Sequence, residues 1–174
     1  MTDTWQDSLL RMIGQWGLVL LAVLVLLLLS AIPLHIVHLA EIRPMFMLMA
    51  VYYWTMLRPT PVVGVFLLGL LLDNILDYPL GMNAFVLLLA QILTTHNRKF
   101  LLGQSFLVTW AGFAVVALGA GVLEWLLFSL FNFTVIAIKS MVLSVILSAV
   151  LFPVVVLPLA AVNRALLGRH HDAP

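Results

Sequence analysis

The chain has 174 residues, of which 64% are hydrophobic and only 9% are charged, and its formal net charge is +1. This composition excludes a water-soluble globular domain, and the small net charge argues against a nucleic-acid partner. The absence of cysteine excludes disulfides, thiol catalysis and cysteine-based metal sites. The sequence therefore predicts a single all-α integral membrane domain, in which any activity lies within or beside the bilayer.

The first apolar segment, residues 12–32, is uncharged and rich in leucine. At about 1.5 Å per residue it is long enough to cross a bilayer, and we interpret it as an uncleaved transmembrane helix. After Pro33, the three-residue spacing of His35, His38 and Glu41 indicates one polar edge of a short interfacial helix. A metal site is the alternative, but no further ligand is evident, so we predict no metal here.

Three short helices with tight turns between them are predicted next, at residues 44–57, 61–76 and 80–95. Pro44 suits a first helical turn, because its missing N–H would have no helical partner there. Arg58-Pro59 and Leu80-Gly81 supply the turns, since a proline disfavours helix in the residue before it and glycine tolerates turn conformations. We expect the three helices to form one compact unit.

The segment His96-Asn97-Arg98-Lys99 predicts a polar loop after the fourth helix. Two longer helices are predicted to follow it, at residues 100–131 and 134–167, which brings the number of crossings to six. Pro153 and Pro158 predict a kink in the last helix, because proline removes a helical hydrogen bond.

Six crossings place both termini on the same side of the membrane. We predict that both are cytoplasmic, because lysine and arginine are enriched in cytoplasmic loops. In this orientation six of the eight basic residues lie inside, namely Arg11, Arg58, Arg98, Lys99, Arg164 and Arg169. Arg43 and Lys139 then lie toward the outside.

Gly69, Asp73 and Asp77 form a G-x-x-x-D-x-x-x-D pattern on one helix face. This pattern resembles the second half of the metal-binding motif of CDP-alcohol phosphotransferases. The first half is missing, because no acidic residue lies between Glu41 and Asp73. We therefore prefer a structural reading, in which Asp73 pairs within the bundle or with a partner.

Glu124 and Lys139 lie at similar distances from the turn near residue 132, so antiparallel helices would bring them to the same depth. We predict an intramembrane ion pair, with a proton or ion relay as the alternative. Ser140, Ser144 and Ser148 form a small-residue stripe, which indicates close packing within the bundle or against a partner helix. No H-E-x-x-H, G-x-S-x-G, Walker or GxGxxG motif occurs, so we predict no catalysis and no cofactor.

The stretch from Arg43 to Asn83 resembles the rod shape-determining protein MreD family. The resemblance rests on the order and spacing of paired and turn residues, namely Arg43-Pro44, Tyr53-Trp54, Arg58-Pro59, Gly69, Asp73, Gly81 and Asn83. We take these residues as the candidate partner-binding or structural positions. Beyond this stretch the similarity is one of general architecture.

The resemblance implies a multi-pass protein of the bacterial inner membrane that acts as a scaffold of the cell-elongation machinery. Its expected partner is an MreC-type single-span protein, which connects it indirectly to MreB filaments and to the RodA transglycosylase with its transpeptidase. Membrane lipids are the other expected contacts. The fold of this family resembles the six-helix substrate-binding components of vitamin uptake transporters, so a small-molecule transport subunit is the alternative function.

Overall fold

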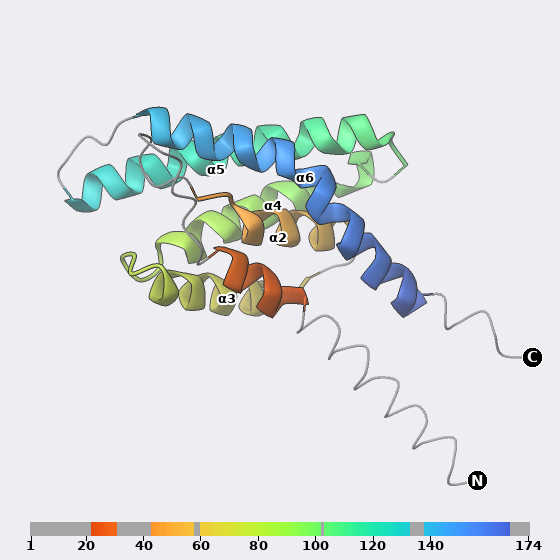
Figure 1. Ribbon diagram of the computed structural model, residues 1–174, viewed down its shortest axis with the longest axis horizontal. Coiled ribbons are helices and arrows are strands. Elements are labelled where there is room, and N and C mark those ends of the chain that lie inside the picture. The colour runs from red at the N-terminus through yellow and green to blue at the C-terminus, as the bar shows by residue number, and fades with distance from the viewer. Residues whose placement is uncertain (1–21, 31–42, 58–59, 102, 133–137, 168–174) are drawn as a thin grey trace, which may run out of the picture.

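The computed structural model describes residues 22–30, 43–57, 60–101, 103–132 and 138–167. The described part of the chain is all helical, as predicted from the sequence, and contains six helices (Figure 1). They are residues 22–30, α2 (Phe46–Leu57), α3 (Val62–Ile75), α4 (Met82–Leu101), α5 (Phe106–Asn132) and α6 (Ile138–Leu167).

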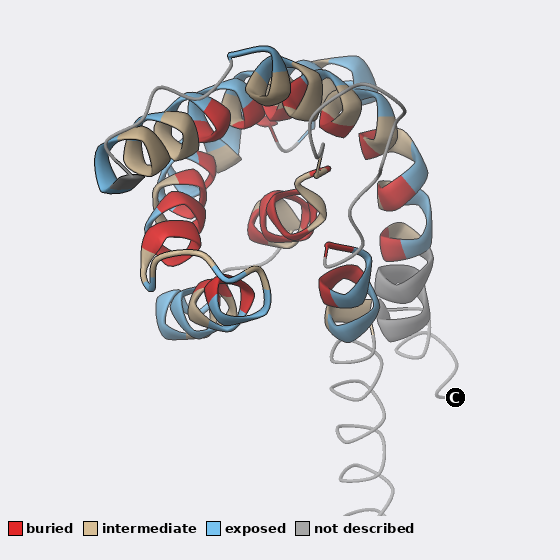
Figure 2. Ribbon diagram, turned by 60° about the vertical axis from the view of Figure 1, so that its left-hand side comes forward, coloured by how far each residue is buried: buried red, intermediate tan, exposed pale blue. Residues whose placement is uncertain are grey.

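The short helix α2 lies at the centre, and the other helices form an arc around it (Figure 2). Eight of its 12 residues are buried, including Met49 and Tyr52. Its sequence explains this position, because a helix that is apolar on all sides has no face suited to water and is found in interiors. The prediction of a short second helix is therefore correct, and its place is the core of the bundle.

An aromatic cluster fixes α2 against the two longest helices. The ring of Tyr52 makes edge contacts with Phe113 of α5 and Phe152 of α6, at centroid distances of 5.5 and 5.8 Å. Phe113 and Phe152 stack on each other at 4.2 Å. The Tyr52 hydroxyl donates a hydrogen bond to the carbonyl of Thr109 at 3.0 Å, so its polar end is satisfied within the core.

The predicted polar loop at residues 96–99 is wrong, because α4 continues through this segment to Leu101. Three of its polar side chains bond back to carbonyls four residues earlier, namely those of Thr94, Thr95 and Asn97. These bonds satisfy the side chains without ending the helix. The turn instead contains Gly103, whose φ of 97° suits glycine.

The basic residue Arg98, in the last turns of α4, bonds the end of the neighbouring helix α2. Its Nε donates to the carbonyl of Met56 and its Nη2 to the carbonyl of Leu57, both at 2.8 Å. These are carbonyls at the end of α2, which lack partners within their own helix. Arg98 therefore ties the end of α4 to the end of the central helix.

We expect Arg98→Ala to lower the free energy of unfolding by about 2 kcal/mol, because hydrogen bonds from a charged group contribute about 1.5–3 kcal/mol. The neighbouring Lys99 is exposed, so Lys99→Ala is the matched control and should leave stability unchanged. Thermal unfolding of both variants in the same detergent measures the difference. Equal unfolding temperatures would contradict the role given to Arg98.

Helix α6 changes direction near its middle, where Figure 1 shows the second half turning away from α5. Pro153 and Pro158 both lie inside this helix. Each proline lacks an N–H and crowds the preceding turn, so the bend has an identified cause.

Two helical segments are long and apolar enough to cross a membrane, Phe106–Phe131 and Ile138–Ala160. They expose apolar side chains over most of their length, as a lipid-facing surface does. Two other apolar helices, α2 and α3, are shorter than a crossing. The predicted six crossings and the predicted orientation remain predictions.

Candidate functional site

Asp73 lies at the end of α3, and its carboxyl group is fully buried. One carboxyl oxygen accepts from the backbone N–H of Gly81 at 2.9 Å, and from that of Ala84 at a longer 3.5 Å. The other accepts from the backbone N–H and the side-chain amide of Asn83, at 2.8 and 2.9 Å. Asp73 thus caps the beginning of α4 from a different helix.

This cap favours the structural interpretation of Asp73 in the G-x-x-x-D-x-x-x-D pattern, as a contact within the bundle, over the metal-binding one. The first N–H groups of a helix lack internal partners, and an acidic side chain is stabilised at a helix N-terminus. Asp77 is exposed in the following turn, with a φ of 53°, and does not share the position of Asp73. Within the described residues, no group of three histidine, cysteine or acidic side chains is placed to hold a metal.

Gly69 allows α3 and α4 to approach closely beside this cap. A Cβ atom added at Gly69 would lie 2.2 Å from the Cα of Ala84 and 2.7 Å from its nitrogen. These are backbone atoms, which cannot move aside as a flexible side chain can. Gly81 has a φ of 96°, which allows the chain to turn into α4.

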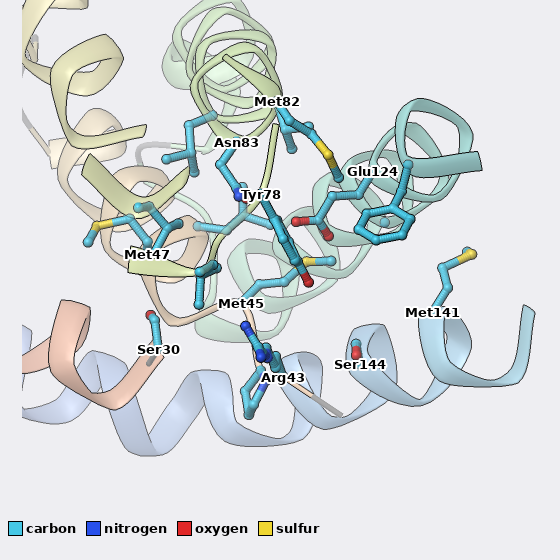
Figure 3. Close-up of a pocket in the computed structure, with 18 of the residues that line it drawn as sticks. Ser30, Arg43, Met45, Met47, Tyr78, Met82, Asn83, Glu124, Met141 and Ser144 are labelled. Carbon is cyan, nitrogen blue, oxygen red and sulfur yellow. The ribbon is translucent and has the colours of Figure 1, made fainter. Parts of the chain in front are cut away.

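A cavity of about 280 Å³ opens where α2, α4 and α6 begin and α3 and α5 approach their ends (Figure 3). Much of its wall is apolar, formed by side chains such as Leu72 and Phe128. Its polar and charged lining residues come from four of the helices and from the segments before α2 and after α3, and are Ser30, Arg43, Tyr78, Asn83, Glu124, Ser140 and Ser144. Figure 3 shows the Arg43 guanidinium and the Glu124 carboxylate both directed into the cavity.

Arg43 and Pro44, which precede α2, both line this cavity. The Arg43 guanidinium carbon lies 5.8 Å from the centroid of the Tyr78 ring, within the range of a cation–π contact. The rings of Tyr78 and Phe128 also make an edge-to-face contact, at a centroid distance of 5.5 Å. Tyr78 therefore holds the arginine at the wall formed by the α3–α4 turn.

The structure brings some predicted residues together and separates others. Gly69, Asp73, Gly81 and Asn83 meet at the junction of α3 and α4. The aromatic pair Tyr53-Trp54 lies on the central helix α2, where Tyr53 is buried and Trp54 is partly buried. Arg58 and Pro59 lie outside the described residues, as do His35, His38 and Glu41.

The predicted ion pair between Glu124 and Lys139 has no contact to support it in the described part of the chain. Glu124 faces the cavity, whereas Lys139 is exposed and does not line it. The serine stripe faces inward, because Ser140 and Ser144 line the cavity and Ser148 is fully buried. The hydroxyl of Ser148 accepts from the backbone N–H of Met45 at 2.9 Å, so packing within the bundle is the correct reading of that residue.

Sequence reasoning missed two polar contacts that fix α2 and the turn after it. Gln91 donates from its side-chain amide to the carbonyl and the hydroxyl of Thr60, both at 2.9 Å, and Arg98 bonds the end of α2. Both residues lie on α4, 31 to 42 positions from their partners. The sequence shows each of them only as a polar residue within a helix, which does not identify its partner.

Comparison with known proteins gives one family. The profile of a family described as rod shape-determining protein MreD matches residues 10–162 of this chain. An uncharacterized protein of Rickettsia prowazekii (strain Madrid E), RP566, is 27% identical over 96 residues. The matched region covers 55% of this chain and 56% of that relative. None of the solved structures matches the chain.

Proposed function

The chain belongs to the MreD family of rod shape-determining proteins, and from this premise we propose that it is a non-catalytic membrane scaffold of the bacterial cell-elongation complex. In this proposal it associates in the inner membrane with an MreC-type single-span protein. That partner connects it indirectly to MreB filaments and to the RodA synthase with its transpeptidase. Its contribution is to hold the complex together during lateral peptidoglycan synthesis.

One observation carries the non-catalytic part of this proposal. Asp73, the acid that most resembles part of a metal motif, uses both carboxyl oxygens to bond the start of α4. A carboxyl group that is fully buried and bonded in this way is held in one orientation by its own fold. It supports the architecture, and a scaffold requires such rigidity without requiring chemistry.

We place the partner helix on the outward face of α3. This helix stands at one end of the arc and packs mainly against α4. Its other side exposes Val63, Leu67 and Leu71, which follow one another at four-residue spacing and form a continuous ridge. With 14 residues, α3 is about 21 Å long, shorter than the bilayer core of about 30 Å. A longer helix beside it would cover its ends.

Two leucines of similar exposure test this face. Leu67 on α3 is 58% exposed and Leu118 on α5 is 52% exposed. We expect Leu67→Trp to reduce co-purification of the MreC-type partner at least about tenfold, because a bulky ring prevents close helix packing. Leu118→Trp changes the same residue type on another apolar face and should leave co-purification unchanged. If both variants retain the partner equally, the α3 face is not the contact.

Depletion of the protein tests the scaffold function itself. Rod-shaped cells that lose it should become round, and the Leu67→Trp protein should restore the rod shape less well than Leu118→Trp. Cells that keep their rod shape after complete depletion would contradict the proposed function. The alternative function, a subunit of a vitamin-type transporter, instead predicts loss of uptake with shape unchanged.

A further inference from the structure

The cavity at the end of the bundle has a distribution of charge that the scaffold role does not use. Glu124 places a carboxylate in it from α5, within a helix that is otherwise apolar. In the described part of the chain, this carboxylate has no hydrogen bond and no ion pair. A charged group without a partner inside a membrane protein is costly, and such residues commonly mark a binding site or an ion path.

The wall near Glu124 carries a second acid. Asn83 lines the cavity and donates its side-chain amide to Asp73, which therefore lies one side chain behind the wall. Two acids close to one side of a cavity favour a cation in the space beside them. The carboxylate of Glu124, which lines the cavity, is the group that a bound ammonium would contact.

A positive group lines the same cavity from another element. Arg43 lies before α2, and its guanidinium carbon lies 5.8 Å from the centroid of the Tyr78 ring. A guanidinium carries five N–H donors in a planar fork. Such a fork matches the oxygens of a phosphate or a carboxylate.

We propose that this cavity binds a small zwitterion, with its ammonium group at Glu124 and its phosphate at Arg43. Phosphoethanolamine has this chemistry, either as a phospholipid headgroup or as a free molecule. One ordered water needs about 10–15 Å³ of such space, so a cavity of about 280 Å³ has room for the eight non-hydrogen atoms of phosphoethanolamine. Apolar side chains such as Leu76 and Phe46 line the remainder of the wall and suit the glycerol end of a lipid.

Binding to the purified full-length protein separates the two charges. The probes are phosphoethanolamine and its N-acetyl derivative, which keeps the phosphate and removes the positive charge. We expect phosphoethanolamine to raise the unfolding temperature in a saturable way, and the acetylated probe to need at least about a tenfold higher concentration. Equal responses to the two probes, or no response to either probe or lipid, would overturn the proposal.

The lipid source is tested by native mass spectrometry in nanodiscs of defined composition. A retained phosphatidylethanolamine molecule, with no retention of phosphatidylglycerol, identifies the headgroup as the ligand. Binding of the soluble probe alone identifies a free molecule, and supports the same site chemistry. Retention of both lipids to the same extent would show that Glu124 does not select an ammonium group, and would overturn the proposal.

Two variants locate the binding. Glu124→Gln keeps the size of the side chain and removes its charge, so it should weaken binding of phosphoethanolamine at least about tenfold while leaving the acetylated probe unchanged. Lys139→Gln removes a charge from an exposed residue near the start of α6 that does not line the cavity, and should bind as the native protein does. If Glu124→Gln does not fold, the comparison of the two probes on the native protein still decides the question. Unchanged selectivity in a folded Glu124→Gln protein would refute the assigned contact.

Discussion

Replacing Gly69 with leucine is expected to prevent the native packing of α3 on α4. Even the first added atom would lie 2.2 Å from a backbone carbon of Ala84, so the two helices must separate before any leucine rotamer fits. Forcing larger side chains into a packed interface costs about 1–3 kcal/mol or more, and here the obstacle is rigid backbone. We expect a loss of at least about 3 kcal/mol and a protein that aggregates on size-exclusion chromatography.

Gly119 provides the matched control, since it is also a glycine within a long helix. A Cβ atom added there meets nothing within 4 Å. Gly119→Leu should therefore leave the unfolding temperature unchanged or raise it slightly, because leucine favours helix over glycine by about 0.5–1 kcal/mol. Equal stability of the Gly69 and Gly119 variants would contradict the expected steric conflict between a side chain at position 69 and the backbone of Ala84.

Replacing Asp73 with alanine is expected to have the second large effect. The variant leaves the backbone N–H groups of Gly81 and Asn83 without their acceptor, and an unsatisfied buried donor costs about 1–3 kcal/mol. We expect the free energy of unfolding to fall by about 2–4 kcal/mol. Hydrogen exchange should increase first at the beginning of α4, because that is where the cap acts.

Two further variants separate the cap from a general effect of charge. Asp73→Asn keeps one acceptor oxygen but turns an NH₂ group toward one of the N–H donors, so its stability should lie between native and Asp73→Ala. Asn74 is exposed one residue further on, and Asn74→Ala should behave as native. An Asp73→Asn protein as stable as the native one would contradict the double-acceptor role.

The sequence predicted the features that depend on local chemistry. The all-α class followed from apolar composition, and the short helices α2 and α3 and the turn into α4 followed from Pro44, Gly81 and the apolar runs. The prolines correctly indicated the bend in α6. The predicted loop at residues 96–99 was wrong because polarity was taken to mean a chain break, whereas Asn97 bonds its own helix and Arg98 reaches the end of α2.

The features that depend on long-range contacts could not be predicted. The pattern around Asp73 suggested metal chemistry, a partner or a bundle contact, and only the structure shows which N–H groups it meets. The same limit applies to Glu124, which sequence spacing predicts at the depth of Lys139, although Glu124 lines the cavity and Lys139 is exposed. Depth along a helix is set by sequence spacing, but the direction of a side chain depends on how each helix is rotated in the bundle.

Gly69 and Asp73 also illustrate why a binding defect needs a stability control. Both belong to the stretch that resembles the MreD family, and the sequence makes both of them candidate partner-binding positions. In the structure both residues are buried. Loss of a partner in these variants would therefore report a damaged α3–α4 junction, whereas Leu67 tests the outer surface without disturbing it.

The central helix has a consequence for the order of events during synthesis. With 12 residues, α2 is about 18 Å long, well short of a bilayer core of about 30 Å, and backbone groups at or beside its ends depend on Arg98 and Ser148. The ribosome makes both of these residues after α2 itself, and unsatisfied backbone groups cost several kcal/mol in lipid. The helix at the centre of the finished bundle therefore reaches its final position only after α6 has been translated. Chains that terminate before Ser148 are expected substrates for membrane quality-control proteases.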